Sequence, residues 1–310
     1  MNYLITGGAR GIGRHLSRSL LLGGNRVFLL DADEAELGNT MEMLSVAVAA
    51  AAGRGEGWGG EGKEVGRGGE GKEVGRGGEG KEKEFGSALC DLRDREQIRE
   101  VVGRVGEFFG GRLDVLINNA MALPHTWSGS KQISDASATV EEEWDAKLAV
   151  GLTAPFLLSR LCLPLLSRDN THPASSSSPS PSNPGTIINI SSTRAHQSEP
   201  DSEAYATAKA GLLGLTHALA ISLGPRHGIR VNAILPGWIH VLDECAEGDG
   251  RGREWEEGLT DEDARWHPVG RVGRAEDVAR AVGFLVESGF VTGAEIVVDG
   301  GVGRKMVYPE

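Results

Sequence analysis

The sequence predicts an α/β protein with a doubly wound, mostly parallel sheet covered by helices on both faces, in a single domain. Short apolar runs such as NYLIT, DVLINNA and TIINI alternate with helical patterns, which is typical of strands joined by helical crossovers. A glycine-rich turn lies directly between the first apolar run and the first helical pattern. The chain has 310 residues. Without its two low-complexity segments it has roughly 250 residues, a size that fits one domain.

Composition excludes several classes of partner. The net charge of -12 and the absence of a basic stripe argue against nucleic acid. Cys90, Cys162 and Cys245 are an odd, widely spaced set, which indicates reduced thiols and no metal site. An apolar strand begins just after Met1, without a basic region or a long hydrophobic segment. We therefore expect a cytoplasmic protein with no membrane partner.

The first strand is expected over residues 2–6, and GGARGIG follows it before the helical pattern IGRHLSRSLLL. This order of strand, glycine turn and helix is the context in which glycines bind phosphates. Gly7 and Gly11 would permit the tight turn and a close backbone approach, and Gly13 would let the helix pack on the strand. The helix N-terminus would then face a pyrophosphate. A glycine turn without a ligand is the alternative.

The second strand, residues 26–30, ends in Asp31. A carboxylate there can accept hydrogen bonds from both hydroxyls of an adenosine ribose and would repel a 2′-phosphate, which favours NAD over NADP. Arg10 in the glycine turn is a cation that could serve a phosphate, so NADP stays open. Alternatively, Asp31 caps the helix that begins near Glu34.

Two segments, 47–85 and 167–185, interrupt the pattern. The first is rich in Gly, Glu, Lys and Arg, and EGKEVGRGG begins at Glu61 and again at Glu70, with a degraded copy at Glu79. Three short copies without large apolar residues cannot bury a face, so we expect a flexible surface insert, with a charged interaction tail as the alternative. The second is rich in Ser and Pro and predicts an extended surface linker.

Candidate catalytic residues follow the apolar run TIINI. Tyr205 and Lys209 are four residues apart, so a helix would place both on one face. A phenol with an ordinary pKa of roughly 10 is a weak catalyst at neutral pH, but a nearby ammonium favours its ionised form. Ser192, at the end of the strand, could hold a carbonyl or alcohol oxygen while Tyr205 gives or takes its proton. A surface Tyr beside a surface Lys is the alternative.

Ser192 followed by Tyr205-x-x-x-Lys209, together with the turn Thr-Gly-x-x-x-Gly-x-Gly, resembles the signature of the short-chain dehydrogenase/reductase family. The resemblance implies reversible hydride transfer between a nicotinamide cofactor and a secondary alcohol or ketone. Tyr205 would be the acid and base, Lys209 would lower its pKa and hold the ribose, and Ser192 would polarise the substrate oxygen. The family spacing selects Ser192, with Ser191 as the alternative.

The resemblance also implies cofactor contacts along the carboxyl edge of the sheet. They are Gly7, Arg10, Gly11, Ile12, Gly13, Asp31, Asp91, Leu92, Asn119, Tyr205, Lys209, Pro236, Gly237 and Ile239. In the family, the counterparts of Asp91 and Leu92 lie beside the adenine, and those of the Pro236-Gly237 turn lie against the nicotinamide. The polar stretch 240–267 has the position of a substrate lid. The family's usual assembly implies a homodimer or a homotetramer.

Three residues depart from the family pattern. Met121 stands in place of a glycine, Gly151 in place of an asparagine within the helix expected over 139–165, and Val241 in place of a threonine that contacts the cofactor. Together they motivate a second hypothesis, a catalytically weak dinucleotide-binding sensor or scaffold. A third hypothesis is an NADPH-dependent carbonyl reductase.

Overall fold

The computed structural model describes residues 1–53, 84–167 and 185–306. The strands are β1 (Asn2–Thr6), β2 (Arg26–Asp31), β3 (Phe85–Leu89), β4 (Val115–Asn118), β5 (Thr186–Ile190), β6 (Arg230–Pro236), β7 (Ile239–His240), β8 (Gly273–Arg274) and β9 (Glu295–Val298). The helices are α1 (Gly11–Leu22), α2 (Glu34–Gly53), α3 (Arg95–Phe108), α4 (Ala138–Leu148), α5 (Ala154–Leu161), α6 (Leu163–Leu166), α7 (Glu203–His227), α8 (Ala246–Arg251), α9 (Asp261–Trp266) and α10 (Ala275–Glu287). Shorter turns are η1 (Ser128–Ser130), η2 (Ala149–Thr153), η3 (Thr193–Ala195) and η4 (Val302–Arg304).

Seven parallel strands form the central sheet in the order β3-β2-β1-β4-β5-β6-β9. The chain moves outward from β1 in one direction and then returns to continue from β4 in the other. Ile5 in β1 pairs with Leu29 in β2 and with Ile117 in β4, which fixes the register at this switch point. The predicted doubly wound sheet is confirmed, and a small parallel pair, β7 and β8, lies apart from it.

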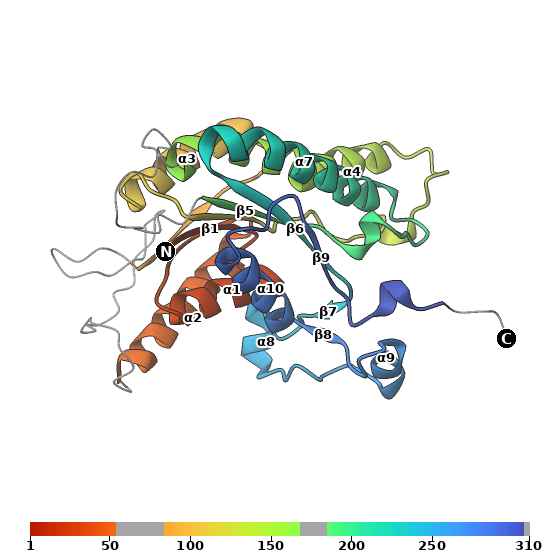
Figure 1. Ribbon diagram of the computed structural model, residues 1–310. Coiled ribbons are helices and arrows are strands. Elements are labelled where there is room, and N and C mark those ends of the chain that lie inside the picture. The colour runs from red at the N-terminus through yellow and green to blue at the C-terminus, as the bar shows by residue number, and fades with distance from the viewer. Residues whose placement is uncertain (54–83, 168–184, 307–310) are drawn as a thin grey trace.

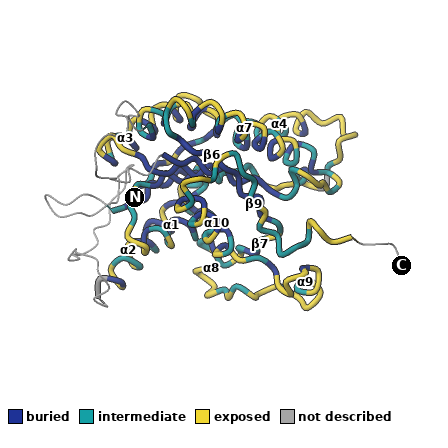
Figure 2. The backbone as a smooth tube through the Cα atoms, viewed as in Figure 1, coloured by how far each residue is buried: buried dark blue, intermediate teal, exposed yellow. Residues whose placement is uncertain are grey.

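Helices cover both faces of the sheet (Figure 1): α3, α4 and α7 lie on one face, and α1, α2 and α10 on the other. Successive residues of a strand pack into the cores on opposite faces of the sheet, because side chains alternate across a sheet. Leu4 packs in the core under α3 and α7, whereas Ile5 packs in the core under α1 and α10. Figure 2 shows the resulting buried centre. Strands buried on both faces explain the continuous apolar runs of the sequence.

Helix α7 is the described helix that is long and apolar enough to span a bilayer by length and composition. In this fold it packs on β6, and it buries Lys209 and Thr216. Its apolar character therefore serves the core of the domain.

The two expected inserts begin later and end earlier than the sequence indicated. Residues 47–53 continue α2, because their alanines are strong helix formers, and Phe85 already belongs to β3. The amide of Ser167 donates to the Leu163 carbonyl (2.9 Å), and the amide of Arg230 donates to the Gly185 carbonyl (2.9 Å), so 167 and 185 belong to the fold. The nine-residue repeat lies outside the described residues.

The helix expected over 139–165 is interrupted at η2, a π-helical turn. Pro155 lacks the amide that would donate to the carbonyl of Gly151 four residues earlier, so the regular ladder cannot continue there. Gly151, one of the departures from the family pattern, lies in this turn.

Candidate active site

The predicted site residues gather at one edge of the sheet, where the strands end. Gly7 follows β1, Asp31 ends β2, Asp91 follows β3, Asn119 follows β4, Ser192 follows β5 and Pro236 ends β6. Ligands of doubly wound sheets bind at this carboxyl edge, beside the point where the strand order reverses. The edge between β1 and β4 is that point here.

The glycine turn has the backbone shape that its sequence predicts. Gly7 and Gly11 have φ values of +63° and +58°, a region that favours glycine. A Cβ on Gly13 would lie 1.9 Å from the Gly7 carbonyl oxygen, so no side chain fits there. The side-chain amide of Asn119 donates to the carbonyls of Thr6 (3.1 Å) and Gly7 (3.0 Å) and fixes the turn to β4.

The first turn of α1 can hold an anion. The amide of Gly11 donates to the carbonyl of Glu244 (2.7 Å), whereas those of Ile12 and Gly13 meet no protein acceptor within the described part of the chain. Unpaired amides at a helix N-terminus suit a phosphate. The residues present therefore fit the pyrophosphate of a dinucleotide, with Ile12 and Gly13 as the donors.

Asp31 is fixed by the backbone of the glycine turn. Its Oδ2 accepts from the amide of Ala9 (3.0 Å) and its Oδ1 from the amide of Asp33 (3.1 Å). Asp33 provides the cap of α2, accepting from the amide of Glu36 (3.1 Å), so the capping alternative for Asp31 is wrong. Each carboxylate oxygen of Asp31 keeps a second acceptor position.

Arg10 points to acidic side chains. Its guanidinium lies 2.8 Å from the Asp33 carboxylate and 3.3 Å from that of Glu36. The cation of the glycine turn is thus already paired, and the surroundings of Asp31 are acidic.

The remaining predicted cofactor contacts have structural partners of their own. The guanidinium of Arg93 donates to the Asp91 carboxylate (2.6 Å), and this hydrogen bond lowers the pKa of Asp91. Leu92 is buried in the core, and Ile239 pairs with β8. The amide of Gly237, after Pro236, donates to the Val298 carbonyl (2.9 Å).

Ser192, Tyr205 and Lys209 come together as predicted. The Ser192 hydroxyl lies close enough to the Tyr205 phenol to lower the pKa of that phenol. Lys209 is buried one helical turn further along α7, with its Nζ 5.6 Å from the centre of the Tyr205 ring and donating to the Ile190 carbonyl (2.8 Å). The hydroxyl of Ser191 instead donates to the Lys209 carbonyl (2.9 Å), which leaves Ser192 as the serine of the site.

Burial dominates the protonation of this group. It raises the pKa of Tyr205, against the opposing effects of the Ser192 hydroxyl and of Arg194. Burial also lowers the pKa of Lys209 from 10.5 to about 8. The family resemblance predicts that Lys209 lowers the pKa of Tyr205. In the cofactor-free protein, desolvation of the phenol is the largest influence, and the pKa is raised.

Met121 and Gly151, two departures from the family pattern, are in contact. A Cβ on Gly151 would lie 2.7 Å from the Sδ of Met121 and 3.1 Å from the Cβ of Ala208. The Met121 thioether thus fills the space above Gly151, next to Ala208, which directly precedes Lys209 in α7. The two departures are one packing arrangement, which sequence reasoning treated as separate defects.

Sequence reasoning missed a charged cluster that docks the segment 241–251 on α1. The carboxylate of Glu244, only 5% exposed, contacts His15 (3.0 Å) and Arg18 (2.5 Å). Fully buried Arg14 pairs with Asp249. The spacing of Arg14 and Arg18 on one helix face was the available signal, because buried cations require partners.

This docked segment, which we call the strap, crosses the glycine turn. The amide of Ala246 donates to the Glu36 carboxylate (2.9 Å) on α2, and the Val241 side chain lies 3.5 Å from where a Cβ of Gly11 would be. The front half of the expected substrate lid therefore lies on the cofactor side of the cleft.

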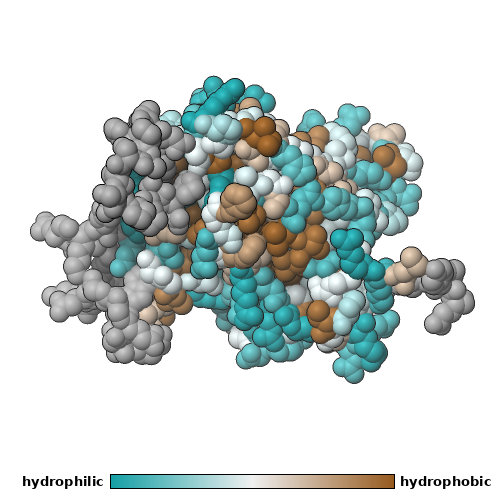
Figure 3. Space-filling model, viewed as in Figure 1, coloured by the Kyte–Doolittle hydropathy of each residue, from teal (hydrophilic) through white to brown (hydrophobic). Residues whose placement is uncertain are grey.

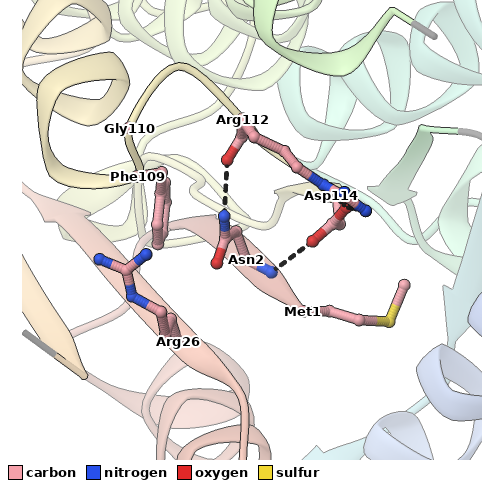
Figure 4. A pocket seen from close by; sticks show the side chains of 7 residues that line it. All are labelled: Met1, Asn2, Arg26, Phe109, Gly110, Arg112 and Asp114. Carbon is pink, nitrogen blue, oxygen red and sulfur yellow. Dashed lines mark hydrogen bonds and ion pairs between the residues drawn. The ribbon is translucent and has the colours of Figure 1, made fainter. Parts of the chain in front are cut away.

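A separate hollow of about 520 Å³ lies at the amino edge of the sheet, far from these residues (Figure 4). Its lining groups are paired: Asn2 donates to Asp114 (2.8 Å) and to the Arg112 carbonyl (2.7 Å), and Arg26 lies over the Phe109 ring. We interpret these contacts as structural, because they hold together the N-terminal ends of neighbouring strands. Among the described residues no cluster of metal-ligating side chains forms, and the three cysteines are free.

Known proteins resemble this chain in sequence and in fold. The sequence model of a family described as enoyl-(acyl carrier protein) reductase matches residues 72–303. An uncharacterised oxidoreductase of Thermotoga maritima is 38% identical over 223 residues, which cover 71% of this chain and 77% of that protein. The (3R)-3-hydroxyacyl-CoA dehydrogenase of Mus musculus is 30% identical over 301 residues, covering 96% of this chain and 95% of that protein.

A solved structure extends the likeness to the fold. An apo SCOR enzyme of Clostridium thermocellum is 35% identical, with a TM-score of 0.68, and the match covers 99% of this chain and 94% of that one. The carboxyl-edge site, the sheet order and these matches agree. The chain belongs to the short-chain dehydrogenase/reductase family, whose members are nicotinamide-dependent oxidoreductases acting on hydroxyl and carbonyl groups.

Proposed function

We propose that the protein transfers a hydride reversibly between NAD and a secondary alcohol or ketone. The observation that carries the proposal is the assembly of Ser192, Tyr205 and Lys209 at the same sheet edge as a glycine turn, whose helix amides at Ile12 and Gly13 meet no acceptor among the described residues. Bound nicotinamide would supply or accept the hydride. The protein residues then have to hold the substrate oxygen, move one proton and exclude water.

Each catalytic side chain has a role that follows from its surroundings. The Ser192 hydroxyl donates to the substrate oxygen and polarises it, and the Tyr205 phenol gives its proton to that oxygen during reduction or takes it during oxidation. Burial raises the pKa of Tyr205 and so maintains the neutral phenol that reduction requires. Lys209, held by the Ile190 carbonyl, has further donors for the ribose hydroxyls.

The charges near Asp31 support NAD as the preferred cofactor. Asp31, Asp33 and Glu36 surround the expected position of the adenosine ribose, and the nearby Arg10 is paired with two of them. A 2′-phosphate would meet uncompensated carboxylate there, whereas ribose hydroxyls would find acceptors. NADPH-dependent carbonyl reduction is accordingly the less favoured alternative.

The substrate is proposed as a small-molecule alcohol or ketone. The mouse relative is a (3R)-3-hydroxyacyl-CoA dehydrogenase, which makes hydroxyacyl thioesters one class to test. A catalytically weak dinucleotide-binding protein is the second candidate, and the occupation of the space above Gly151 by Met121 is the observation that favours it.

We also propose a homodimer or homotetramer. Figure 3 shows apolar side chains at the centre of one face, near α10 and β9. Phe284, Phe290 and Val297 are the exposed apolar residues of this region, and β9 is an edge strand whose outer side is open to pairing.

The test is a screen of alcohols, ketones and hydroxyacyl thioesters with each cofactor, following the absorbance of reduced nicotinamide. Tyr205→Phe serves as the blank, and fluorescence titration of NADH and NADPH compares cofactor affinity. Turnover with NAD that disappears in the variant supports the proposal. Tight NADH binding without turnover of any substrate would favour the weak-binding candidate, and tighter binding of NADPH would contradict the role given to Asp31.

A further inference from the structure

Three side chains form a polar wall beside Tyr205. The His125 ring lies edge-on to the Tyr205 ring, with 6.1 Å between centroids and an interplanar angle of 69°. One oxygen of the Glu199 carboxylate contacts both His125 Nε2 (3.1 Å) and the Arg194 guanidinium (2.7 Å). A single carboxylate thus joins a cation to the imidazole that packs on the catalytic phenol. We call His125, Arg194 and Glu199 the wall.

The fold holds the wall at the catalytic group. Arg194 lies in η3, directly after Ser192, and its amide donates to the Ser192 hydroxyl oxygen (3.2 Å). Glu199 lies further along the same loop, and its carbonyl accepts from the hydroxyl of buried Ser202 (2.8 Å), the residue before α7. The loop that carries two wall residues is therefore the direct connection between Ser192 and Tyr205.

The wall is partly exposed to solvent. The side chains of His125, Arg194 and Glu199 are 46%, 31% and 38% exposed, in contrast to buried Lys209. Solvent weakens the action of such charges but does not remove it over short distances.

The charged groups around Tyr205 act in opposite directions. Arg194 favours the ionised phenol and lowers its pKa, whereas Glu199 opposes ionisation and raises it. Lys209 lies over the ring and donates to the Ile190 carbonyl. Burial and Arg194 lower the pKa of His125, which favours its neutral form. Arg194 is thus the cation of the wall that acts on the phenol.

We propose that Arg194 and Glu199 are positioning residues for the proposed function, and that their opposed charges together balance the protonation of Tyr205. As an ion pair the two are nearly neutral. Removal of either one leaves the charge of the other uncompensated beside the phenol, so the two removals have opposite effects.

Direct titration of Tyr205 in the cofactor-free protein tests this proposal without any substrate. The chain has three tyrosines, at 3, 205 and 308, and burial raises the pKa of Tyr3 to about 12. In a Tyr3→Phe, Tyr308→Phe background the ultraviolet absorbance of phenolate reports Tyr205 alone. Arg194→Gln is expected to raise its pKa by about half a unit, and Glu199→Gln to lower it by about half a unit.

Two controls separate electrostatics from misfolding. Arg194→Lys keeps the charge and is expected to titrate like the parent, and Glu276→Gln removes an acid paired with Arg280 on the distant α10 and is expected to change nothing. Circular dichroism and thermal unfolding identify any variant that fails to fold. Shifts of equal sign in Arg194→Gln and Glu199→Gln, or shifts no larger than that of Glu276→Gln, would overturn the proposal.

Failure of the proposed function is distinguishable from failure of this inference. If no substrate is turned over but the two variants shift the titration in opposite directions, the wall acts as inferred and the catalytic role of Tyr205 is wrong. If a substrate is found, the pH dependence of kcat is expected to move in the same directions as the titration.

Discussion

The two halves of the cleft manage burial of charge in opposite ways. On the cofactor side, Glu244 is buried, which alone would raise its pKa, but contacts with His15 and Arg18 bring the pKa below its ordinary value. On the catalytic side, Lys209 is just as buried and has no carboxylate partner among the described residues, so burial lowers its pKa to about 8. The paired charge of Glu244 holds the cofactor half in place. The buried ammonium of Lys209, which has no carboxylate partner among the described residues, keeps the catalytic half reactive and lowers the stability of the fold.

The largest expected effect is the loss of the proton carrier. Tyr205→Phe keeps the ring but removes the hydroxyl, so kcat is expected to fall by about 10²- to 10⁴-fold, while NADH binding measured by fluorescence changes little. The catalytic half alone would then be damaged. Equal turnover in the variant and the parent would remove Tyr205 from the mechanism.

The next effect concerns stability on the catalytic side. Lys209→Met removes a buried ammonium and, at pH 7 without cofactor, is expected to raise the free energy of unfolding by about 2 kcal/mol while activity is lost. The folded pKa of Lys209, about 8, lies below its ordinary 10.5. Between those values the unfolded chain binds more protons, so the parent gains stability as pH rises and the difference between the two proteins shrinks.

Urea unfolding of both proteins from pH 7 to 10.5 measures this difference. Lys305→Met is the control, since that lysine is exposed and lies over Trp266. A Lys209→Met protein less stable than the parent at every pH would contradict the idea of an uncompensated charge.

The packing between the two departures from the family pattern comes next in size. Gly151→Asn places a side chain against Met121 and is expected to destabilise the fold by about 1–3 kcal/mol. Met121→Ala opens that space, so the double variant is expected to recover a large part of the loss. Thermal unfolding of the two single variants and the double variant gives the coupling, and strictly additive effects would show that the two positions are independent.

The smallest effect is expected at the strap. Glu244→Gln keeps the shape but leaves His15 and Arg18 without their carboxylate, so NADH binding should weaken about threefold as the strap loosens, which is less than 1 kcal/mol. Glu247→Gln is the matched control, because Glu247 lies in the same segment and, within the described ranges, pairs only with Arg251 and Arg253. Isothermal titration calorimetry compares them, and equal affinities would separate the strap from cofactor binding.

The strap also carries a pH dependence. The folded pKa of Glu244 lies below its ordinary value of 4.5, so its contribution to stability is present above that value and is lost as pH falls through the lower, folded pKa. The parent should therefore lose more stability below pH 4.5 than Glu244→Gln does. Acid unfolding of both proteins measures the difference.

The doubly wound parallel sheet and the glycine turn were predictable, because they depend on local pattern along the chain. The choice of Ser192 over Ser191 came from the spacing of the family signature. Apolar runs that alternate with helical patterns specify a parallel sheet, and such a sheet brings the ends of its strands together. The residues that end or closely follow six of those strands could therefore be placed at one edge without knowledge of the packing.

Contacts between distant segments were not predictable in this way. Met121 packs above Gly151, and Glu244 contacts α1. Both contacts join residues far apart in sequence, and no local pattern pairs them. The direction of the pKa shift of Tyr205 was not predictable for the same reason, because desolvation depends on everything packed around the phenol. The extent of α2 was missed because its last residues are small and carry little periodic signal.

The positions at which the two low-complexity stretches join the fold have a practical consequence. Gly53 ends α2 and Phe85 begins β3, while Ser167 follows α6 and Thr186 begins β5. Helices in this architecture run back toward the starts of the strands, so both junctions open on the side of the sheet opposite the chemistry (Figure 1). Either junction is thus a natural attachment point for a purification tag, a fluorophore or a fused enzyme, placed where a passenger stays clear of substrate and cofactor.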